Sequence, residues 1–266
     1  MNLDEVPLRR IDAGGVAIAL REWGNGDPLV LIHGLGTHSG LWRYQAAEFG
    51  ARFRVVALDL RGFGSSERPT SSDAYRIDAF VDDVEAVLSA LRLGEVDCLG
   101  TSMGGFIAQS LALRRPKLVR RLVLAHTAAR MTIPKDVLAA RLAALRTTSM
   151  EDYGRLVAEQ ALARGAQSPL FDWIARMVAA NDRIVYERIL TEGLRDFDAR
   201  DRLDELRNPV LVVFGDTDRV IPAEASEDLA ARIPGAEKTL LPGAGHIGYA
   251  EAPVPFNAAV MSFLTK

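Results

Sequence analysis

Ser102 lies in a five-residue segment whose residue types favour nucleophilic catalysis. The segment 100–104 reads Gly-Thr-Ser-Met-Gly; it follows an apolar run over 96–99 and precedes a helix-like run over 106–113. A sharp turn from a strand into a helix leaves no room for side chains two positions before and after the serine, and glycine occupies both positions. The free N–H groups at the start of the helix favour a negative charge beside the serine. We therefore predict that Ser102 is a nucleophile.

Three other turns supply the groups that a nucleophilic serine needs. Each follows an apolar run: His-Gly-Leu-Gly at 33–36, Gly-Asp-Thr-Asp at 215–218 and Pro-Gly-Ala-Gly-His at 242–246. An acid and a histidine therefore follow the serine in the order Ser, Asp, His. This is the order of α/β-hydrolase triads, and it differs from the orders found in the two unrelated serine protease folds.

These motifs make the chain similar to the α/β-hydrolase family over nearly its whole length. The segment 59–66, Asp-Leu-Arg-Gly-Phe-Gly-Ser-Ser, is similar to a turn that members carry after the fourth strand. Within the family the chain most resembles the small enol-lactonases, the cofactor-free haloperoxidases (perhydrolases) and the esterases, which share its His-Gly loop and its Ser-Met-Gly-Gly elbow. The resemblance implies an α/β-hydrolase fold: a mostly parallel eight-stranded sheet flanked by helices, with a helical cap inserted after the sixth strand.

The resemblance also implies a catalytic triad of Ser102, Asp218 and His246. In the family the acid typically stands four residues before a proline, as Asp218 stands before Pro222; Asp216 is the alternative acid, which would otherwise brace the loop. Of the four histidines only His246 lies beyond both acids, in a glycine-flanked loop. His246 would remove the proton from Ser102 while Asp218 fixes the imidazole tautomer, and water would then release the product acid from an acyl-serine.

Two backbone N–H groups and three further histidines complete the predicted site. The amides of Leu35 and Met103 are expected to form the oxyanion hole. We assign His33 a structural role in the oxyanion loop and place His38 on the surface or the pocket rim. His126 ends the sixth strand where the cap begins, so it is a candidate pocket residue that could face the substrate, with a structural role as the alternative.

The expected cap carries apolar and basic side chains that could select the substrate. Trp173, Met177 and, directly after the histidine, Ile247 are candidate pocket residues, which favours a medium-sized, largely apolar acyl or lactone group; packing within the cap is the alternative for the cap residues. Ile247 differs from the Trp often found there in the meta-cleavage C–C hydrolases. Five cap arginines are candidate partners for a substrate carboxylate, or otherwise lie on solvated helix faces: Arg130, Arg141, Arg146, Arg155 and Arg176.

The function expected from these features is hydrolysis of a carboxylic ester or lactone, similar to that of the enol-lactonases. C–C bond hydrolysis or perhydrolysis by the same triad is the alternative, and a slow, receptor-like ligand-binding protein is a third reading. The triad implies no cofactor and no metal. Cys98, the only cysteine, cannot form an internal disulfide and is expected to be buried and inert. Asp59 and Arg61 lie in a tight turn and are expected to be structural.

Short apolar runs that alternate with helix-like stretches predict the sheet that would position these groups. Near-continuous apolar runs suit strands covered on both faces by helices. The expected strands are 9–11, 16–23, 29–32, 55–60, 96–99, 122–125, 210–214 and 239–241. The expected helices are 41–49, 77–91, 103–114, 223–233 and 253–264. In such a sheet the functional groups lie at the carboxyl ends of the strands.

The alternation stops between 127 and about 207, where apolar spacings predict helices only. Ser149 with Asp152 resembles a capping signature at the start of one of these helices. We therefore expect the first part of the core at 1–126, a helical cap at 127–207 and the second part of the core at 208–266. A helical extension of the core is the alternative to a cap over the nucleophile.

Length, charge and hydropathy argue against several other classes of protein. The chain has 266 residues, 48% of them hydrophobic, which suits one large α/β domain with an insertion. A net charge of −3 and scattered Lys and Arg residues argue against a nucleic-acid partner. No apolar run approaches the roughly 18 residues of a membrane span. We expect a soluble, cytoplasmic monomer or homodimer that acts on a small molecule.

Overall fold

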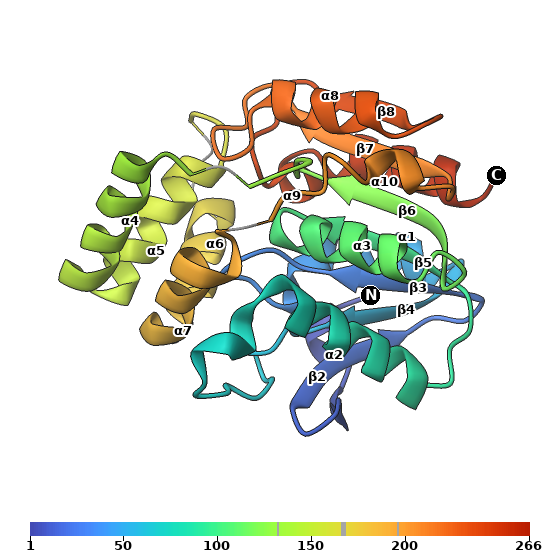
Figure 1. The fold of residues 1–266 in the computed structure, drawn as a ribbon, viewed down its shortest axis with the longest axis horizontal. Helices are drawn as coiled ribbons and strands as arrows, with labels where there is room; N and C mark the ends of the chain where they lie inside the picture. The colour runs from blue at the N-terminus through green and yellow to red at the C-terminus, as the bar shows by residue number, and fades with distance from the viewer. Residues whose placement is uncertain (132, 166–168, 196) are drawn as a thin grey trace.

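A sheet of eight strands organises the computed structural model, which describes residues 1–131, 133–165, 169–195 and 197–266 (Figure 1). The strands are β1 (Leu8–Asp12), β2 (Ala17–Trp23), β3 (Asp27–Ile32), β4 (Phe53–Leu58), β5 (Val96–Thr101), β6 (Val119–Ala125), β7 (Val210–Gly215) and β8 (Glu237–Leu241). They lie in the order β1-β2-β4-β3-β5-β6-β7-β8. β2 is antiparallel to β1 and β4, and the six strands from β3 to β8 are mutually parallel. The predicted fold class is confirmed.

Helices follow most of the strands, as the sequence predicts. They are α1 (Ala46–Gly50), α2 (Ile77–Ala90), α3 (Met103–Arg114), α4 (Lys135–Thr147), α5 (Met150–Ala161), α6 (Pro169–Ala179), α7 (Arg183–Arg188), α8 (Ala223–Arg232), α9 (Gly248–Glu251) and α10 (Pro253–Leu264). The helix predicted at 41–49 is instead a 3-10 segment, Ser39–Tyr44, followed by α1, because the backbone departs from helical geometry at Trp42. In the described part of the chain no helix is long and apolar enough to cross a membrane.

Successive residues of the central strands pack on opposite faces of the sheet, as strand geometry requires. In β3, Val30 and Ile32 belong to one buried cluster with residues of α2, α3 and α8. Leu29 and Leu31 belong to a second cluster with residues of α1, α9 and α10. Because helices cover both faces, these strands are mostly apolar and do not alternate regularly with polar residues.

Helices α4 to α7 form a group of their own between β6 and β7. In Figure 1 this group lies at the left, and the arrowheads of β6 and β7 point toward it. The predicted cap of α5 is present, since the Asp152 N–H donates to Ser149 Oγ at 3.0 Å. One isolated β-bridge, between Arg130 and Asp198, departs from the helix-only prediction. The group is therefore the predicted helical cap after the sixth strand, whereas the exact boundaries of the three predicted segments stay a prediction.

Candidate active site

Ser102 occupies a strained turn between β5 and α3. Its backbone angles are φ +52° and ψ −120°, a conformation that residues with side chains rarely adopt. A Cβ at Gly100 would lie 2.2 Å from the Gly104 carbonyl oxygen, and one at Gly104 would lie 2.2 Å from the carbonyl oxygen of Ile32. Both glycines are therefore required, as the sequence predicts.

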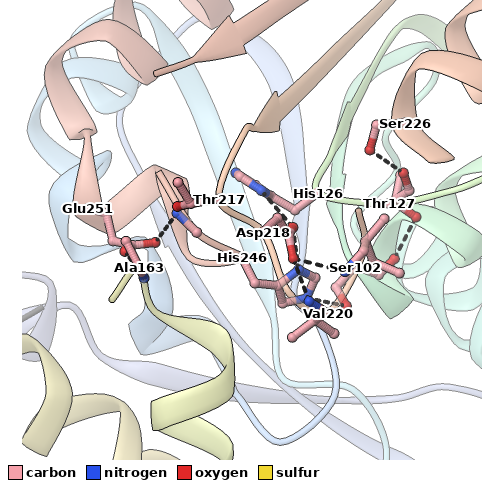
Figure 2. Close-up of polar contacts among 12 residues, drawn as sticks. Ser102, His126, Thr127, Ala163, Thr217, Asp218, Val220, Ser226, His246 and Glu251 are labelled. Atoms are coloured by element: carbon pink, nitrogen blue, oxygen red, sulfur yellow. Dashed lines mark hydrogen bonds and ion pairs between the residues drawn. The ribbon is translucent and has the colours of Figure 1, made fainter. Parts of the chain in front are cut away.

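Hydrogen bonds with Ala125, at the end of β6, and with Thr127 hold this turn in place. The Ser102 N–H donates to the Ala125 carbonyl oxygen at 3.0 Å. The Thr127 hydroxyl donates to the Ser102 carbonyl oxygen at 2.9 Å (Figure 2). These bonds satisfy the serine's backbone groups and do not involve its hydroxyl.

Ser102, His246 and Asp218 form a continuous chain of hydrogen bonds (Figure 2). His246 Nε2 lies 2.9 Å from Ser102 Oγ, and His246 Nδ1 lies 2.8 Å from Asp218 Oδ2. The second carboxylate oxygen, Oδ1, accepts hydrogen bonds of 2.8 Å from the N–H groups of Val220 and Ile221. The structure thus brings together the three residues predicted to form the triad.

The surroundings of Asp218 keep its carboxylate ionised. Burial alone would raise its pKa, but the adjacent His246 charge and a hydrogen bond from His126 hold the pKa of Asp218 well below its usual range. Asp216, the alternative acid, is exposed and accepts a hydrogen bond from the Gly243 N–H at 2.7 Å. It braces the loop and does not contact His246.

Leu35 and Met103, whose amides are predicted to form the oxyanion hole, line the same cavity as Ser102. Met103 is the first residue of α3, so its N–H has no acceptor within the helix. A Cβ at Gly34 would lie 3.0 Å from Ser102 Cβ, which shows how closely the loop before Leu35 approaches the serine. These positions agree with the predicted oxyanion hole, which stays a prediction.

His33 fixes the loop that carries Leu35. Its Nδ1 donates to the Gly34 carbonyl oxygen at 2.7 Å, and its Nε2 accepts the Leu60 N–H at 2.9 Å. Burial lowers the pKa of His33 to about 4, so the ring is neutral and can make both bonds. His38 is half-buried and accepts from the Gly40 N–H at the start of a 3-10 segment; it does not line the cavity.

A cavity of about 310 Å³ opens above Ser102 and His246. Ile247 lines this cavity, as predicted, together with residues of the cap. The lining is mostly apolar, and Arg141 on α4 is the one Lys, Arg, Asp or Glu side chain among the described lining residues. The cap side of the wall includes Val137, Ala140, Arg141, Ala144, Tyr153, Leu156, Val157, Gln160, Ile174, Val178, Tyr186 and Leu190.

Trp173 and Met177 do not line this cavity, so their prediction as pocket residues is wrong. Met177 is buried among core residues, and the Trp173 ring packs edge-on against Tyr44, with ring centroids 5.9 Å apart. Ile174 and Val178, one position further along α6, line the cavity instead. The helical spacing was correct, but the helix is rotated by about one residue, roughly 100°.

His126 also lies outside the cavity, contrary to its prediction as a pocket residue. Its side chain is fully buried behind Asp218, and its Nδ1 lies 3.3 Å from Asp218 Oδ2 (Figure 2). The three residues His126, Asp218 and His246 bring potential metal-ligating atoms within 4.8 Å of one another. The hydrogen bonds of both imidazoles to one carboxylate oxygen account for this cluster, and we assign no metal to it.

Sequence reasoning missed Glu251, which connects the His246 loop to the cap (Figure 2). Its carboxylate oxygens accept hydrogen bonds from the N–H groups of Ala163 at 2.6 Å and Gly245 at 2.9 Å. The His246 N–H itself donates to the Ala161 carbonyl oxygen at the end of α5, at 2.7 Å. The carboxyl end of α5 therefore fixes the backbone that carries the histidine. Nothing in the local sequence marks Glu251 apart from other acidic helix residues.

The remaining candidates have the structural roles expected of them. Asp59 accepts hydrogen bonds from the N–H groups of Ser39 and Ser65 at 2.7 and 2.8 Å. Arg61 forms a two-point ion pair with Asp83, with both N–O distances at 2.6 Å. Cys98 is buried in β5, and burial raises the pKa of its thiol to about 12, so it stays protonated.

Comparisons with known proteins agree with this geometry. A family model described as the alpha/beta hydrolase fold matches residues 27–253. The chain is 34% identical to 2-hydroxymuconate semialdehyde hydrolase of Pseudomonas sp. (strain CF600), over 97% of this chain and 94% of that protein. Among solved structures, a hydrolase from Pseudomonas aeruginosa PA01 has a TM-score of 0.90 at 30% identity, covering 97% of this chain and 98% of its own. The enol-lactonase from Burkholderia xenovorans LB400 also has a TM-score of 0.90, at 28% identity, covering 97% and 100%.

Proposed function

Because the chain belongs to the α/β-hydrolase fold family, we propose that it is a serine hydrolase of small or medium-sized carboxylic esters or lactones. The observation that carries this proposal is the hydrogen-bonded chain from Ser102 Oγ through His246 to Asp218, at the base of a mostly apolar cavity. A serine hydroxyl is a weak nucleophile until an adjacent base removes its proton. His246 Nε2 is in position to do so.

The proposed reaction passes through an acyl-serine. His246 takes the Ser102 proton as Oγ attacks the carbonyl carbon, and Asp218 holds the Nδ1–H tautomer and stabilises the imidazolium. The N–H groups of Leu35 and Met103 bind the oxyanion; losing one such donor typically costs ~3 kcal/mol of transition-state stabilisation. His246 then gives its proton to the leaving oxygen, and an activated water hydrolyses the acyl group.

The lining of the cavity supports a substrate that carries a carboxylate. Arg141 is half-buried, and no hydrogen bond or ion pair of its guanidinium is present among the described residues. Arg146, on the same helix, is instead paired with Glu187 at 2.5 Å. An unpaired guanidinium in a catalytic cavity is a strong partner for a carboxylate, which it can bind through two parallel hydrogen bonds. The similarity to an enol-lactonase is consistent with a lactone of this kind.

C–C bond hydrolysis is the second candidate function. It is favoured by the 34% identity to a 2-hydroxymuconate semialdehyde hydrolase over nearly the full length of both chains. The same three residues could serve that reaction. Perhydrolysis would need hydrogen peroxide in place of water on the acyl-serine, and nothing in the cavity selects between these two small nucleophiles.

The test compares p-nitrophenyl butyrate with the p-nitrophenyl monoester of glutaric acid, and measures kcat/KM for both. Arg141→Gln should lower kcat/KM for the glutarate ester about tenfold or more and leave kcat/KM for the butyrate ester nearly unchanged, because only the glutarate ester offers a carboxylate. Arg146→Gln is the matched control on the same helix and should change neither. Equal effects of Arg141→Gln on the two esters would contradict the carboxylate partner.

Parallel assays separate the candidate reactions. The wild-type protein is given a small enol-lactone, a vinylogous 1,5-diketone acid, and the butyrate ester with hydrogen peroxide. Faster turnover of the lactone than of the diketone acid supports the main proposal. Turnover of the diketone acid without turnover of any ester or lactone would replace it with C–C hydrolysis.

A further inference from the structure

His126 places a second imidazole on the carboxylate of Asp218, and the proposed mechanism makes no use of it. His126 follows β6 directly, and Asp218 lies in the loop after the neighbouring β7. Asp218 Oδ2 lies 3.3 Å from His126 Nδ1 and 2.8 Å from His246 Nδ1 (Figure 2). A single carboxylate oxygen therefore faces two histidines.

The surroundings of His126 fix its tautomer and its orientation. A carboxylate oxygen only accepts, so Nδ1 carries the hydrogen; burial lowers the pKa of His126, which keeps the ring neutral. The unprotonated Nε2 is buried and has no hydrogen-bond partner in the described part of the chain. The backbone of Gly248 packs against the ring, because a Cβ there would lie 2.5 Å from Nε2. The imidazole cannot turn away from Asp218 without moving α9.

Two features of His126 are energetically unfavourable. Its backbone has φ +48°, in the left-handed region that residues with side chains rarely occupy. Its Nε2 lone pair is buried without a donor, which a native structure seldom tolerates. The side chain's one hydrogen bond among the described residues goes to Asp218. A side chain retained at such a cost, in contact with a catalytic acid, points to a role in the site.

We propose that His126 is a positioning residue for the triad, an inference that rests on the proposed hydrolase mechanism. The backbone N–H groups of Val220 and Ile221 hold Oδ1, and the His126 N–H holds Oδ2. Together they fix the plane of the carboxylate, so that His246 Nδ1–H meets Oδ2 in one geometry.

The other ionisable groups that face this cluster come from α9 and from the loop before it. Tyr249 has its ring centroid 6.0 Å from that of His126, and burial raises the pKa of Tyr249, so its hydroxyl is neutral. Glu251 lies beyond it, and burial raises the pKa of that carboxyl. The His246 ring centroid is 6.0 Å away. Asp218 is thus the one charge in direct contact with His126 among the described residues.

The test compares His126→Leu, which removes the donor, with His126→Asn, whose side-chain amide can donate from nearly the same place and which tolerates positive φ. In His126→Leu we expect kcat to fall about tenfold, the effect of one well-placed hydrogen bond, with KM unchanged. His126→Asn should recover most of kcat.

Controls separate positioning from general loss of structure. Ser226→Ala removes another buried hydrogen bond of this region, from Ser226 Oγ to the Thr127 carbonyl oxygen at 2.8 Å, and should lower Tm without the tenfold loss of kcat. If His126→Leu does not fold, proton NMR of the wild-type protein decides: low-field imidazole N–H resonances are expected from His33, His126 and His246, and the one from His126 should be absent in His126→Asn. A wild-type spectrum with no low-field resonance that His126→Asn removes overturns the proposal.

Two kinetic outcomes also overturn it: a His126→Leu variant with wild-type kcat, or equal losses of kcat in His126→Leu and His126→Asn. Ser102→Ala distinguishes failure of this inference from failure of the proposed function. If Ser102→Ala keeps full turnover, the hydrolase mechanism itself fails. If turnover requires Ser102 and His126→Leu behaves as wild type, only the role of His126 fails.

Discussion

Asp216 and Asp218 follow the same strand, and their surroundings give them different chemistry. Asp218 is buried with two backbone N–H groups on one oxygen and two imidazoles on the other. Asp216 is exposed and holds the Gly243 N–H. A carboxylate can orient His246 from position 218 and not from position 216, because position 216 lies on the solvent side of the loop.

Replacing each aspartate with asparagine tests this division. In Asp218→Asn the amide N–H₂ can face His246 Nδ1 and favours the wrong tautomer, so kcat should fall about 10⁴-fold. Asp216→Asn keeps an oxygen for the Gly243 N–H and should change kcat less than about threefold. Steady-state kinetics on one ester measures both. The reverse ranking would assign the acid to Asp216.

For single residues, the sequence predicted the order of the site residues along the chain better than the direction in which each side chain points. The position of Asp218 four residues before Pro222 identified the acid that the structure brings to His246. His126 was a candidate to face the substrate, with a structural role as the alternative, because it ends a strand beside the cap. Its ring instead turns behind Asp218, a direction set by the positive φ of its backbone, and no residue pattern encodes that angle.

Helix α6 shows a similar limit at the scale of secondary structure. Residues spaced by four share a face, so Trp173 with Met177 and Ile174 with Val178 form two neighbouring stripes. Both stripes are apolar, and the sequence does not say which one turns toward the cavity. The tertiary packing decides which stripe lines the cavity. The stripe of Trp173 and Met177 packs against Tyr44 and the core, and the stripe of Ile174 and Val178 lines the cavity.

Val178→Ala and Met177→Ala provide a matched pair on this helix. Val178→Ala enlarges the cavity and should raise kcat/KM for hexanoyl relative to acetyl esters about tenfold. Met177→Ala leaves the cavity wall intact and should lower the free energy of unfolding by about 2–5 kcal/mol with the ester ratio unchanged. Chain-length kinetics and denaturant unfolding measure the two effects. A changed ester ratio in Met177→Ala alone would place the substrate on the other face of α6.

At the scale of the whole molecule, four neighbouring strands deliver the site. Ser102, His126, Asp218 and His246 follow β5, β6, β7 and β8, which lie side by side in that order. Because these strands are parallel, their carboxyl ends meet at one edge, and residues 144 positions apart come within 2.9 Å. The apolar runs predicted these strands. The shape of the cavity was not predictable, since it depends on how the cap packs over that edge.

The measurement that tests the central claim most directly is the mass of the protein after reaction with a fluorophosphonate probe, with the labelled peptide identified. The account predicts one label per chain, on Ser102, in the wild-type protein. It predicts no label and no ester turnover in Ser102→Ala, with the same Tm. A label on another residue, or ester turnover that persists in Ser102→Ala, would contradict the account.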